Sequence, residues 1–556
     1  MQKESVAEIL SKALAKKKIS LKPQEILERI EIPPSSELGD FAFPCFFLAS
    51  KLKQNPAEIA LEIREEISER SKDFQDIQTN GPYINFFVNR SNLAESIIHE
   101  ILEKKDKFGS KEIGKSKKML VEHTSINPNA SPHVGRARNA IIGDSLVRIL
   151  KFQGFDVDVH YYVNDVSKQI AMLVLAGAEK LKFESMLKKY VKISAEIKKS
   201  KKKEQQVFDL LEKFESGDKE TTKKFNKVTS TCVKGQEKIL GRLGIKYDHF
   251  DYESAYLNKS KEVLAGLEKS GKLFQDEEGR IVLDLKNTSI EGKMRTPLLV
   301  LTRSNATGLY PLRDIAYTLD KMKKADSNLI VLGEDQKLYF NQVQEALKLL
   351  NSESPKVVHY SYILLSEGKK KKKMSTRKGD VVLLEDFLDD AIKKAEKKSK
   401  KKSYAKTIGI AAVRYVILKN SADKIINFNL DDALNFEGDT GPYLLYSYAR
   451  ASSILKKIKQ NKKIQLKYDE LEPQEIELIK KFSEFSEVVL KAYNNSDPSH
   501  IANYSYKLAQ AFSDFYQNCP VMKSKNEKFR ILLVKSFRQV LKNSLSLLGI
   551  DVLEEM

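Results

Sequence analysis

The 556 residues carry a formal net charge of +20, from 96 Lys and Arg against 76 Asp and Glu, and 41% of them are hydrophobic. A chain of this length suggests roughly three or four domains, and no apolar run approaches the ~20 residues that a membrane span needs. The positive balance favours a polyanionic partner such as nucleic acid, because each phosphate contact releases condensed counterions. A general lysine-rich bias of the source proteome would give the same charge.

The N-terminal sequence and the spacing of the cysteines indicate where the protein is located and which metal sites to expect. The opening stretch "MQKESVAEILSKALAKKKIS" combines acidic residues with lysines, which fits neither a secretory signal nor a transit peptide, so we expect a cytoplasmic protein. Cys45, Cys232 and Cys519 lie far apart with no paired spacing. We therefore expect three buried thiols, no disulfide framework, no structural zinc and no protein-bound metal.

Residues 1–110 alternate helical patterns with a strand-like end, "GPYINFFVN", and predict a mixed α+β domain. The Gly/Lys-rich stretch "KFGSKEIGKSKK" at 107–118 predicts a domain boundary.

A βαβ unit is predicted next. The apolar run "MLVEHTS" at 119–125 is followed by a loop, by a helical pattern over 136–154 and by the alternating run "DVDVHYYV" at 156–163. The helical stretch places Ile142, Leu146 and Ile149 on one face and Gly154 at its C-cap. A βαβ unit implies a parallel sheet with a ligand site at the carboxyl ends of its strands.

The rest of the chain predicts an insertion, a return to the sheet and a helical domain. Residues from about 165 to 285 are rich in lysine and glutamate and helical in pattern. Strand-like runs return with "RIVLDL", "TPLLVLT", "NLIVLGE" and "VVHYSYILL", so the doubly wound pattern is expected to resume. The last ~150 residues read as successive helices, the final one with Leu533, Phe537, Val540 and Leu541 on one face.

Two motifs carry chemistry. "PHVGRARN" puts His133, Gly135 and Arg136 at a helix start, where free N–H groups and the helix dipole favour an anion. A lone His-x-Gly in a loop is more often structural. "EGKKKKKMSTRKGD" at 367–380 is either a solvated charged segment or a catalytic loop, and it follows the last strand-like run, about 240 residues after the first motif.

The pair of motifs, in this order, resembles the signatures of class I aminoacyl-tRNA synthetases. "HVGR" stands where that class carries His-Ile-Gly-His, and "KMSTR" stands where it carries Lys-Met-Ser-Lys-Ser. Within the class the chain resembles the arginyl-tRNA synthetase family nearly end to end, in "VEHTSINPNASPHVG", "IIGDSLVRIL", "LYPLRDIAYTLDK", "LGEDQKLYFNQV", "KMSTRKGDVVLLED", "FEGDTGPYLLYSYAR", "ELGDFAFPCFFLASKLKQNPAEIA", "NGPYINFFV" and "FSDFYQNCPVM".

The resemblance implies an α/β fold of three domains. An α+β N-terminal additional tRNA-binding domain is expected at 1–110. A Rossmann-like doubly wound catalytic domain is expected at 115–400, with the helical insertion at about 165–285 and the KMSTR loop at 373–377. An all-helical anticodon-binding domain is expected at 401–556.

The resemblance also implies the site residues. The catalytic set is His133, Arg136, Lys373 and Arg377, and the ATP-binding set is Asn129, His133, Gly135, Arg136, Lys373, Met374 and Ser375. The arginine-binding set is Glu122, Asn127, Tyr310, Asp314 and Gln336. Independently of the resemblance, the carboxylates in this set fit an arginine substrate, because a planar guanidinium is best held by carboxylates in forked geometry. Taken singly, Glu122 and Asp314 could equally be surface or salt-bridged residues.

The implied reaction joins L-arginine to tRNA(Arg) through an arginyl-adenylate, with ATP and Mg²⁺ as the substrate complex, no protein nucleophile and no membrane. A monomer is expected. Three departures from the family pattern stand out: Arg136 replaces the second signature histidine, Ser167 stands where relatives often carry Gly, and Tyr339 where they commonly carry His. Two alternatives remain open: a catalytically inactive nucleic-acid-binding descendant, which only Arg136 favours, and a synthetase for another amino acid, for which zinc ligands or a long editing insertion would be expected.

Overall fold

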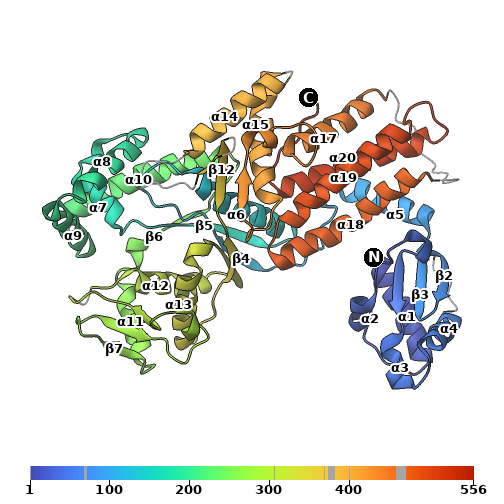
Figure 1. Ribbon diagram of the computed structural model, residues 1–556, viewed down its shortest axis with the longest axis horizontal. Coiled ribbons are helices and arrows are strands. Elements are labelled where there is room, and N and C mark those ends of the chain that lie inside the picture. Colours follow the sequence, from blue (N-terminus) through green and yellow to red (C-terminus); the bar gives the residue numbers. More distant parts are fainter. Residues whose placement is uncertain are drawn as a thin grey trace. The chain divides into compact units, whose positions relative to one another are not determined.

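The computed structural model describes residues 2–67, 72–305, 307–367, 370–372, 382–399, 401–458 and 471–556. The chain forms two compact units (Figure 1). The first comprises Met1–Lys105, Ile458–Ser483 and Ala511–Gln539, and the second comprises Asp106–Lys457, Glu484–Gln510 and Val540–Met556. Lys105, where the N-terminal segment of the first unit ends, lies two residues before the Gly/Lys-rich stretch at 107–118.

The N-terminal segment is α+β, as predicted. Its sheet is antiparallel with the strand order β1-β3-β2, and the predicted strand "GPYINFFVN" is β3. Phe43, Ile84 and Phe86 from β1 and β3 are fully buried in its core. The elements are α1 (Gln2–Lys16), α2 (Pro23–Arg29), β1 (Phe41–Pro44), α3 (Phe46–Leu52), α4 (Pro56–Glu66), β2 (Phe74–Asn80), β3 (Tyr83–Val88) and α5 (Arg90–Lys104).

The second unit is built on a five-stranded parallel sheet with the strand order β11-β10-β4-β5-β6. The strands are β4 (Lys118–Glu122), β5 (Asp156–Val163), β6 (His249–Tyr252), β10 (Ser327–Gly333) and β11 (Lys356–Tyr360). The chain runs outward from β4 through β5 to β6 and, on the other side, from β10 to β11. The point between β4 and β10 is therefore the topological switch point, where ligands of open α/β sheets bind.

Helices cover both faces of this sheet, as expected of a doubly wound fold (Figure 1). Helix α6 (Val134–Phe152) contacts β4, β5 and β10, and α12 (Tyr310–Met322) with α13 (Lys337–Leu349) covers the opposite face. The sequence prediction for α6 is confirmed, because Ile142, Leu146 and Ile149 are buried. Gly154, at φ +87°, directly follows the C-cap Gln153, a conformation that glycine adopts at little cost.

The segment predicted as a helical insertion begins with four helices that share an apolar core around Phe225 and Val228. They are α7 (Lys168–Leu175), α8 (Met186–Ile197), α9 (Lys201–Glu215) and α10 (Lys219–Gly241). The helical pattern does not continue to residue 285, since β6 adds an edge strand to the central sheet. We did not predict β6, because its sequence, His-Phe-Asp-Tyr, is half polar and none of its side chains is fully buried.

The prediction that "RIVLDL" and "TPLLVLT" belong to the doubly wound sheet was wrong. They form β8 (Ile281–Asp284) and β9 (Leu298–Val300), which join β7 (Leu273–Gln275) in a separate antiparallel sheet that follows α11 (Lys259–Glu268). Alternating apolar residues indicate a strand but not its partner, and the connections between these strands contain no α-helix that could form the crossover typical of parallel pairing.

The remaining elements are largely helical, as predicted, and Leu533, Phe537, Val540 and Leu541 are fully buried. A small sheet of order β13-β12-β14 is the exception. The elements are β12 (Ile363–Glu367), β13 (Lys370–Lys372), α14 (Leu384–Lys398), α15 (Lys402–Leu418), β14 (Ile426–Phe428), α16 (Leu430–Ala433), α17 (Gly441–Lys456), α18 (Pro473–Asn495), α19 (Ser499–Asn518) and α20 (Glu527–Leu547).

Two predictions made by exclusion can be checked. All three cysteines are free and buried, as predicted. Within the described part of the chain, none of the helices combines the length and the apolar character needed to cross a membrane.

Candidate active site

The N-terminus of α6 is bonded to residues 382–384, a short segment that follows the second motif in the sequence. His133 is the N-cap residue and forms an isolated antiparallel bridge with Leu383. The Val134 amide donates to the Val382 carbonyl at 3.1 Å, and the Leu384 amide donates to the Pro132 carbonyl at 2.8 Å. The start of α6, which carries the first motif, therefore lies beside residues 382–384.

His133 has the properties of a neutral hydrogen-bonding group. Its Nδ1 is buried and has no hydrogen-bond partner among the described residues. Burial, assisted by the Arg136 cation, lowers the pKa of His133 to about 4, so the ring is neutral near pH 7 and carries one N–H donor. An unpaired buried polar atom costs free energy in the free protein, and a bound ligand relieves that cost.

The other phosphate-side residues lie around the same helix start. Gly135 and Arg136 are half-buried in the first turn of α6, and no hydrogen bond or ion pair to the Arg136 guanidinium occurs within the described ranges. The Asn129 side chain is buried and donates to Gln169 Oε1 at 2.7 Å. Lys373, Met374, Ser375 and Arg377 lie outside the described residues.

Asp314 forms the centre of the predicted arginine pocket. Its Oδ1 accepts a hydrogen bond from the Tyr162 hydroxyl at 3.2 Å, and its Oδ2 accepts one from the Tyr339 hydroxyl at 2.5 Å. Burial raises the pKa of Asp314 above its usual value, and the two hydroxyls oppose that rise because they stabilise the carboxylate. The half-exposed ring of Tyr310 lies 5.1 Å from the ring of Tyr339, centroid to centroid.

Glu122 lies at the carboxyl end of β4, as predicted, but its carboxylate already has a cationic partner. The Lys321 ammonium of α12 forms a buried ion pair with Glu122 Oε2. The negative charge of Glu122 is still near enough to raise the pKa of Asp314. The structure thus separates the two predicted carboxylates: Asp314 is bonded to hydroxyls, and Glu122 is bonded to an internal lysine.

Asn127 and Gln336 follow the carboxyl ends of β4 and β10. Asn127 is half-buried in the loop before α6, and its carbonyl accepts a hydrogen bond from Gln236 Nε2 at 3.1 Å. Gln336, also half-buried, occupies the N-cap position of α13 without a side-chain capping hydrogen bond. Glu122, Asn127 and Gln336 therefore lie at or just beyond the carboxyl ends of the two strands that flank the switch point.

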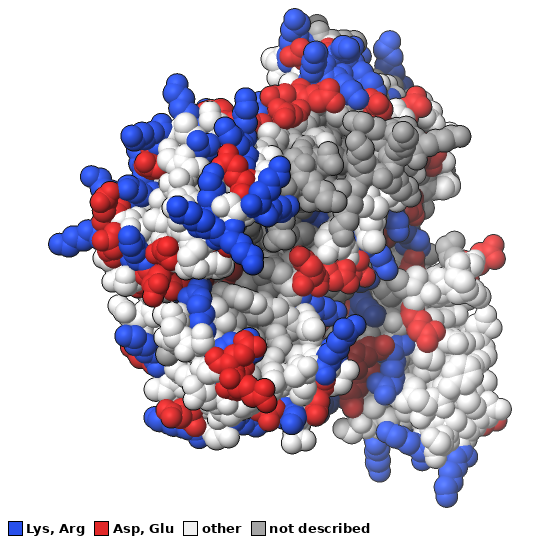
Figure 2. Space-filling model, turned by 60° about the vertical axis from the view of Figure 1, so that its left-hand side comes forward, with Lys and Arg blue, Asp and Glu red and all other residues white. Residues whose placement is uncertain are grey.

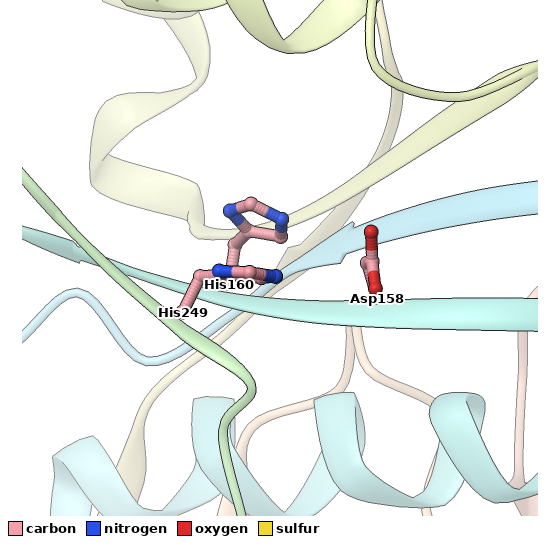
Figure 3. A group of neighbouring side chains, drawn as sticks. All are labelled: Asp158, His160 and His249. Atoms are coloured by element: carbon pink, nitrogen blue, oxygen red, sulfur yellow. The ribbon is translucent and has the colours of Figure 1, made fainter.

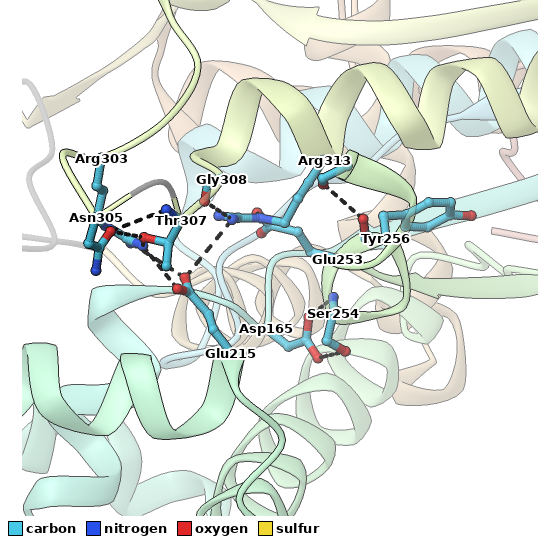
Figure 4. Close-up of polar contacts among 11 residues, drawn as sticks. Asp165, Glu215, Glu253, Ser254, Tyr256, Arg303, Asn305, Thr307, Gly308 and Arg313 are labelled. Atoms are coloured by element: carbon cyan, nitrogen blue, oxygen red, sulfur yellow. Dashed lines mark hydrogen bonds and ion pairs between the residues drawn. The ribbon is translucent and has the colours of Figure 1, made fainter. Parts of the chain in front are cut away.

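A network of ion pairs holds the first turn of α12, beside Asp314 (Figure 4). Arg313 Nε contacts Glu253 Oε1 at 2.5 Å, and Arg313 Nη1 donates to the Gly308 carbonyl at 2.9 Å. Arg303 extends the network to Glu215 of α9 at 2.9 Å. Burial raises the pKa of Glu253 to about 8, and the adjacent Arg313 cation favours its charged form. The network connects the helical insertion to the helix that carries the arginine pocket.

Sequence reasoning missed Tyr162, Lys321 and the Arg313–Glu253 pair. Tyr162 lies near the end of the predicted strand 156–163, so its place at the carboxyl edge was a usable signal. Tyr339 was noted as a departure from the family pattern, and the structure shows that its hydroxyl bonds to Asp314. The position of Lys321 one turn beyond Tyr317 gave no such signal, because helical spacing does not reveal which strand faces a helix.

Comparison with known proteins agrees with this geometry. A family model described as tRNA synthetases class I (R), catalytic domain, matches residues 97–429. The model of the arginyl tRNA synthetase N terminal domain matches residues 3–88, and that of the DALR anticodon binding domain matches residues 444–556.

Comparison with individual proteins indicates the same family. Arginine–tRNA ligase of Methanocaldococcus jannaschii is 38% identical over 98% of both chains, and that of Clostridium perfringens is 35% identical over 97% of this chain and 98% of the relative. Among solved structures, Thermus thermophilus arginyl-tRNA synthetase superposes with a TM-score of 0.82 at 26% identity, and each chain is covered completely. The chain therefore belongs to the arginyl-tRNA synthetase family of class I tRNA synthetases.

Proposed function

We propose that the protein is an arginine–tRNA ligase that activates L-arginine with ATP and transfers it to tRNA(Arg). The observation that carries the site assignment is the environment of Asp314, whose carboxylate is bonded to the Tyr162 and Tyr339 hydroxyls at the carboxyl edge of the sheet. A carboxylate in such a position binds a guanidinium by charge-assisted hydrogen bonds, while the flat rings of Tyr310 and Tyr339 suit its planar group.

The proposed pocket selects arginine over lysine by geometry and charge. The guanidinium presents paired donors in a plane, which a carboxylate accepts in a fork, whereas an ammonium is a point charge with a shorter reach. The negative charge of Glu122 adds to the field, although its carboxylate is held by Lys321. Tyr310 and Gln336 line the guanidinium side, and Asn127 binds the α-amino and carboxyl region.

The first reaction step is in-line attack of the arginine carboxylate on the α-phosphorus of ATP, with pyrophosphate as the leaving group. Asn129, His133, Gly135 and Arg136 hold the phosphates at the start of α6, where the positive end of the helix dipole stabilises the developing charge. Lys373, Met374, Ser375 and Arg377 complete the site from the second motif. Mg²⁺ enters bound to ATP and neutralises phosphate charge.

The second step is attack of a terminal ribose hydroxyl of tRNA on the adenylate carbonyl, with AMP as the leaving group. No protein nucleophile takes part, so catalysis rests on positioning and charge stabilisation. The tRNA meets a protein with a net charge of +20. On the face in Figure 2, Lys and Arg side chains protrude in several groups, with acidic side chains between them. A cytoplasmic location and a monomeric state remain predictions.

The deciding experiment is ATP–pyrophosphate exchange and charging of total tRNA, with tRNA present in both assays because the family generally needs it for activation. Exchange should depend on arginine. Lysine and citrulline should not replace it, since neither supplies a charged planar group. Charging with lysine or citrulline at the arginine rate would refute the pocket assignment. A protein that binds tRNA but exchanges nothing would instead be the inactive descendant.

A further inference from the structure

Three potential metal ligands lie together on two neighbouring strands of the central sheet (Figure 3). They are Asp158 and His160 of β5 and His249 of β6, and one ligand atom of each lies within 4.8 Å of the other two. Asp158 and His160 are two residues apart on one face of β5, and His160 is the register partner of His249. Within the described residues, this is the one group of three or more His, Cys, Asp or Glu side chains with such spacing.

The arrangement includes the outer contact that orients a metal-binding histidine. His160 is 3% exposed, and its Nδ1 lies 2.5 Å from Asp251 Oδ2. A carboxylate at that distance holds the proton on Nδ1, so that Nε2 carries the free lone pair. Histidines that bind metals almost always donate their other ring N–H to a carboxylate or carbonyl in this way. Asp251 is itself held by the Tyr317 hydroxyl at 3.0 Å.

We infer that Asp158, His160 and His249 form a binding site for a divalent transition-metal ion, with Zn²⁺ the ion of matching chemistry. Two imidazoles and one carboxylate are a frequent donor set for Zn²⁺, and water fills the fourth position of a tetrahedral site. Mg²⁺ and Ca²⁺ are excluded as the main occupants because they prefer all-oxygen shells. The prediction of no structural zinc rested on the cysteines, and this cluster contains none.

Metal binding requires a small closure of the cluster. Ligand atoms around a tetrahedral Zn²⁺ lie roughly 3.3 Å apart, given bonds of ~2.0–2.1 Å, so the widest separation must shrink by at most about 1.5 Å. Asp158 and His249 are free to move by rotamer changes because both are at least partly exposed. His160 is held by Asp251, and the stacked His249 ring lies 4.6 Å from it, centroid to centroid.

One group competes with the metal. Lys118 of β4 contacts Asp158 Oδ2 at 2.8 Å, and its side chain is 43% exposed. Its charge repels a cation and occupies one carboxylate oxygen, while Asp158 Oδ1 stays available. The site is therefore expected to bind Zn²⁺ with moderate affinity, and removal of the Lys118 charge should increase that affinity. An ion bound elsewhere on the protein would not respond to Lys118 in this way.

The site lies beside the candidate active site on the sheet, since His160 is the register partner of Glu122 and lies two residues before Tyr162 on β5. A bound ion would join the edge strand β6 to β5 and so stabilise the edge of the sheet. It takes no part in the aminoacylation chemistry. The inference is independent of the proposed function, and the two can fail separately.

The test is titration of the full-length protein, freed of metal by a chelator, with Zn²⁺ in the absence of ATP, followed by calorimetry and by the melting temperature. One ion per chain should bind and raise the melting temperature. His249→Ala and Asp158→Asn should each weaken binding at least 10-fold, and Asp251→Asn should weaken it about 10-fold through loss of ligand orientation. Lys118→Met should tighten it.

The matched control is His99→Ala, which removes an exposed histidine that pairs with Glu103 on α5 and should leave binding unchanged. Pyrophosphate exchange by each variant reports correct folding, since none of these residues belongs to the candidate active site. The inference is overturned if the wild-type protein binds no ion, if His249→Ala or Asp158→Asn binds as tightly as wild type, or if His99→Ala weakens binding equally.

Discussion

At the scale of single residues, Asp314 carries the largest share of the proposed specificity. Its carboxylate accepts two tyrosine hydroxyls in a largely buried position, so its charge is weakly screened by water. A guanidinium brought to such a group gains more than it would at the surface, and a neutral substrate analogue leaves the carboxylate without its cation. Specificity is therefore expected to depend on charge more than on shape.

The first residue-scale prediction is that Asp314→Asn raises the KM for arginine by about 10–100-fold, the equivalent of a lost charged hydrogen bond worth ~1.5–3 kcal/mol. The KM for ATP should change little, because the amide keeps the shape of the side chain. Pyrophosphate exchange against each substrate measures the difference. Asp320→Asn, on the same helix and paired with Lys259 and Lys324, is the control and should alter neither value.

The second residue-scale prediction concerns pH and Tyr339. Burial raises the pKa of Asp314, and the Tyr339 hydroxyl lowers it. Arginine binding needs the carboxylate, so kcat/KM for arginine should rise as the pH rises through this pKa. Tyr339→Phe removes a hydrogen bond to the charged form, which raises the pKa further and moves this acid limb to higher pH.

The control for that experiment is Tyr256→Phe, which removes a tyrosine hydroxyl bonded to Asp320 instead. Its pH profile should match that of the wild type. An acid limb that stays in place in Tyr339→Phe, or moves to lower pH, would contradict the role assigned to the Tyr339–Asp314 bond.

At the scale of elements, helix α6 carries the first motif and is bonded to the chain just after the second motif. Its N-terminus presents His133 and Arg136, and the backbone around its N-cap bonds to residues 382–384. Because an Arg replaces the second signature histidine, we expect its guanidinium to bind ATP phosphates. Arg136→Ala should then lower the adenylation rate by one or more orders of magnitude, as for other lost charge-stabilising donors, whereas Arg136→His should keep substantial activity.

A second readout separates a phosphate ligand from a merely structural arginine. The Arg136 charge helps to lower the pKa of His133, so Arg136→Ala should shift the NMR titration of His133 to higher pH. Arg148→Ala, near the other end of α6 and paired with Asp144, should affect neither the rate nor the His133 titration. Wild-type adenylation in Arg136→Ala would exclude the phosphate role.

Some helices and strands could be predicted from the sequence, and others could not. The helix α6 and the strands β4, β5, β10 and β11 follow from periodicity and caps, which are local. The antiparallel partners of β8 and β9, and the pairing of Glu122 with Lys321, depend on which elements meet in space. Local patterns do not encode such meetings. Asp314 was identified through the family resemblance, whereas its hydroxyl partner Tyr162 was missed.

At the scale of the whole second unit, one buried arginine connects distant parts of the sequence. Arg414 of α15 is fully buried and contacts Asp144 of α6 at 2.5 Å, the Leu548 carbonyl at 2.7 Å and the Leu243 carbonyl at 2.9 Å. Arg414→Met should lower the melting temperature strongly, since loss of one partner of a buried pair costs about 3–5 kcal/mol. Arg148→Met removes the more exposed partner of Asp144 and should cost at most about 1 kcal/mol.

The effect of Arg414→Met should depend on pH in a definite direction. Asp144 is desolvated, which by itself raises its pKa, but the Arg414 and Arg148 cations outweigh this and hold it below the ordinary value of 3.8. A carboxyl with a depressed folded pKa stabilises the fold above its unfolded pKa and loses that contribution as the pH falls through the folded pKa. Calorimetry should therefore show the wild-type advantage shrinking below about pH 4, and an advantage that grows in acid would exclude this role of the pair.

The last prediction concerns how the whole molecule meets tRNA through residues 369–377. Lys370–Lys372 form β13, while Lys369 and the signature residues lie outside the described residues. Lys373 opens the signature, so Lys373→Ala should depress adenylation steeply even at saturating tRNA. Serine at positions 369–372 should instead leave the saturated rate near normal and raise the tRNA concentration required. It should also flatten the salt dependence, by about one unit of slope for each lysine–phosphate ion pair that the substitution removes. Equal loss of adenylation in both variants at saturating tRNA, or a Lys373→Ala variant that changes only tRNA affinity, would show that the run does not divide at Lys373.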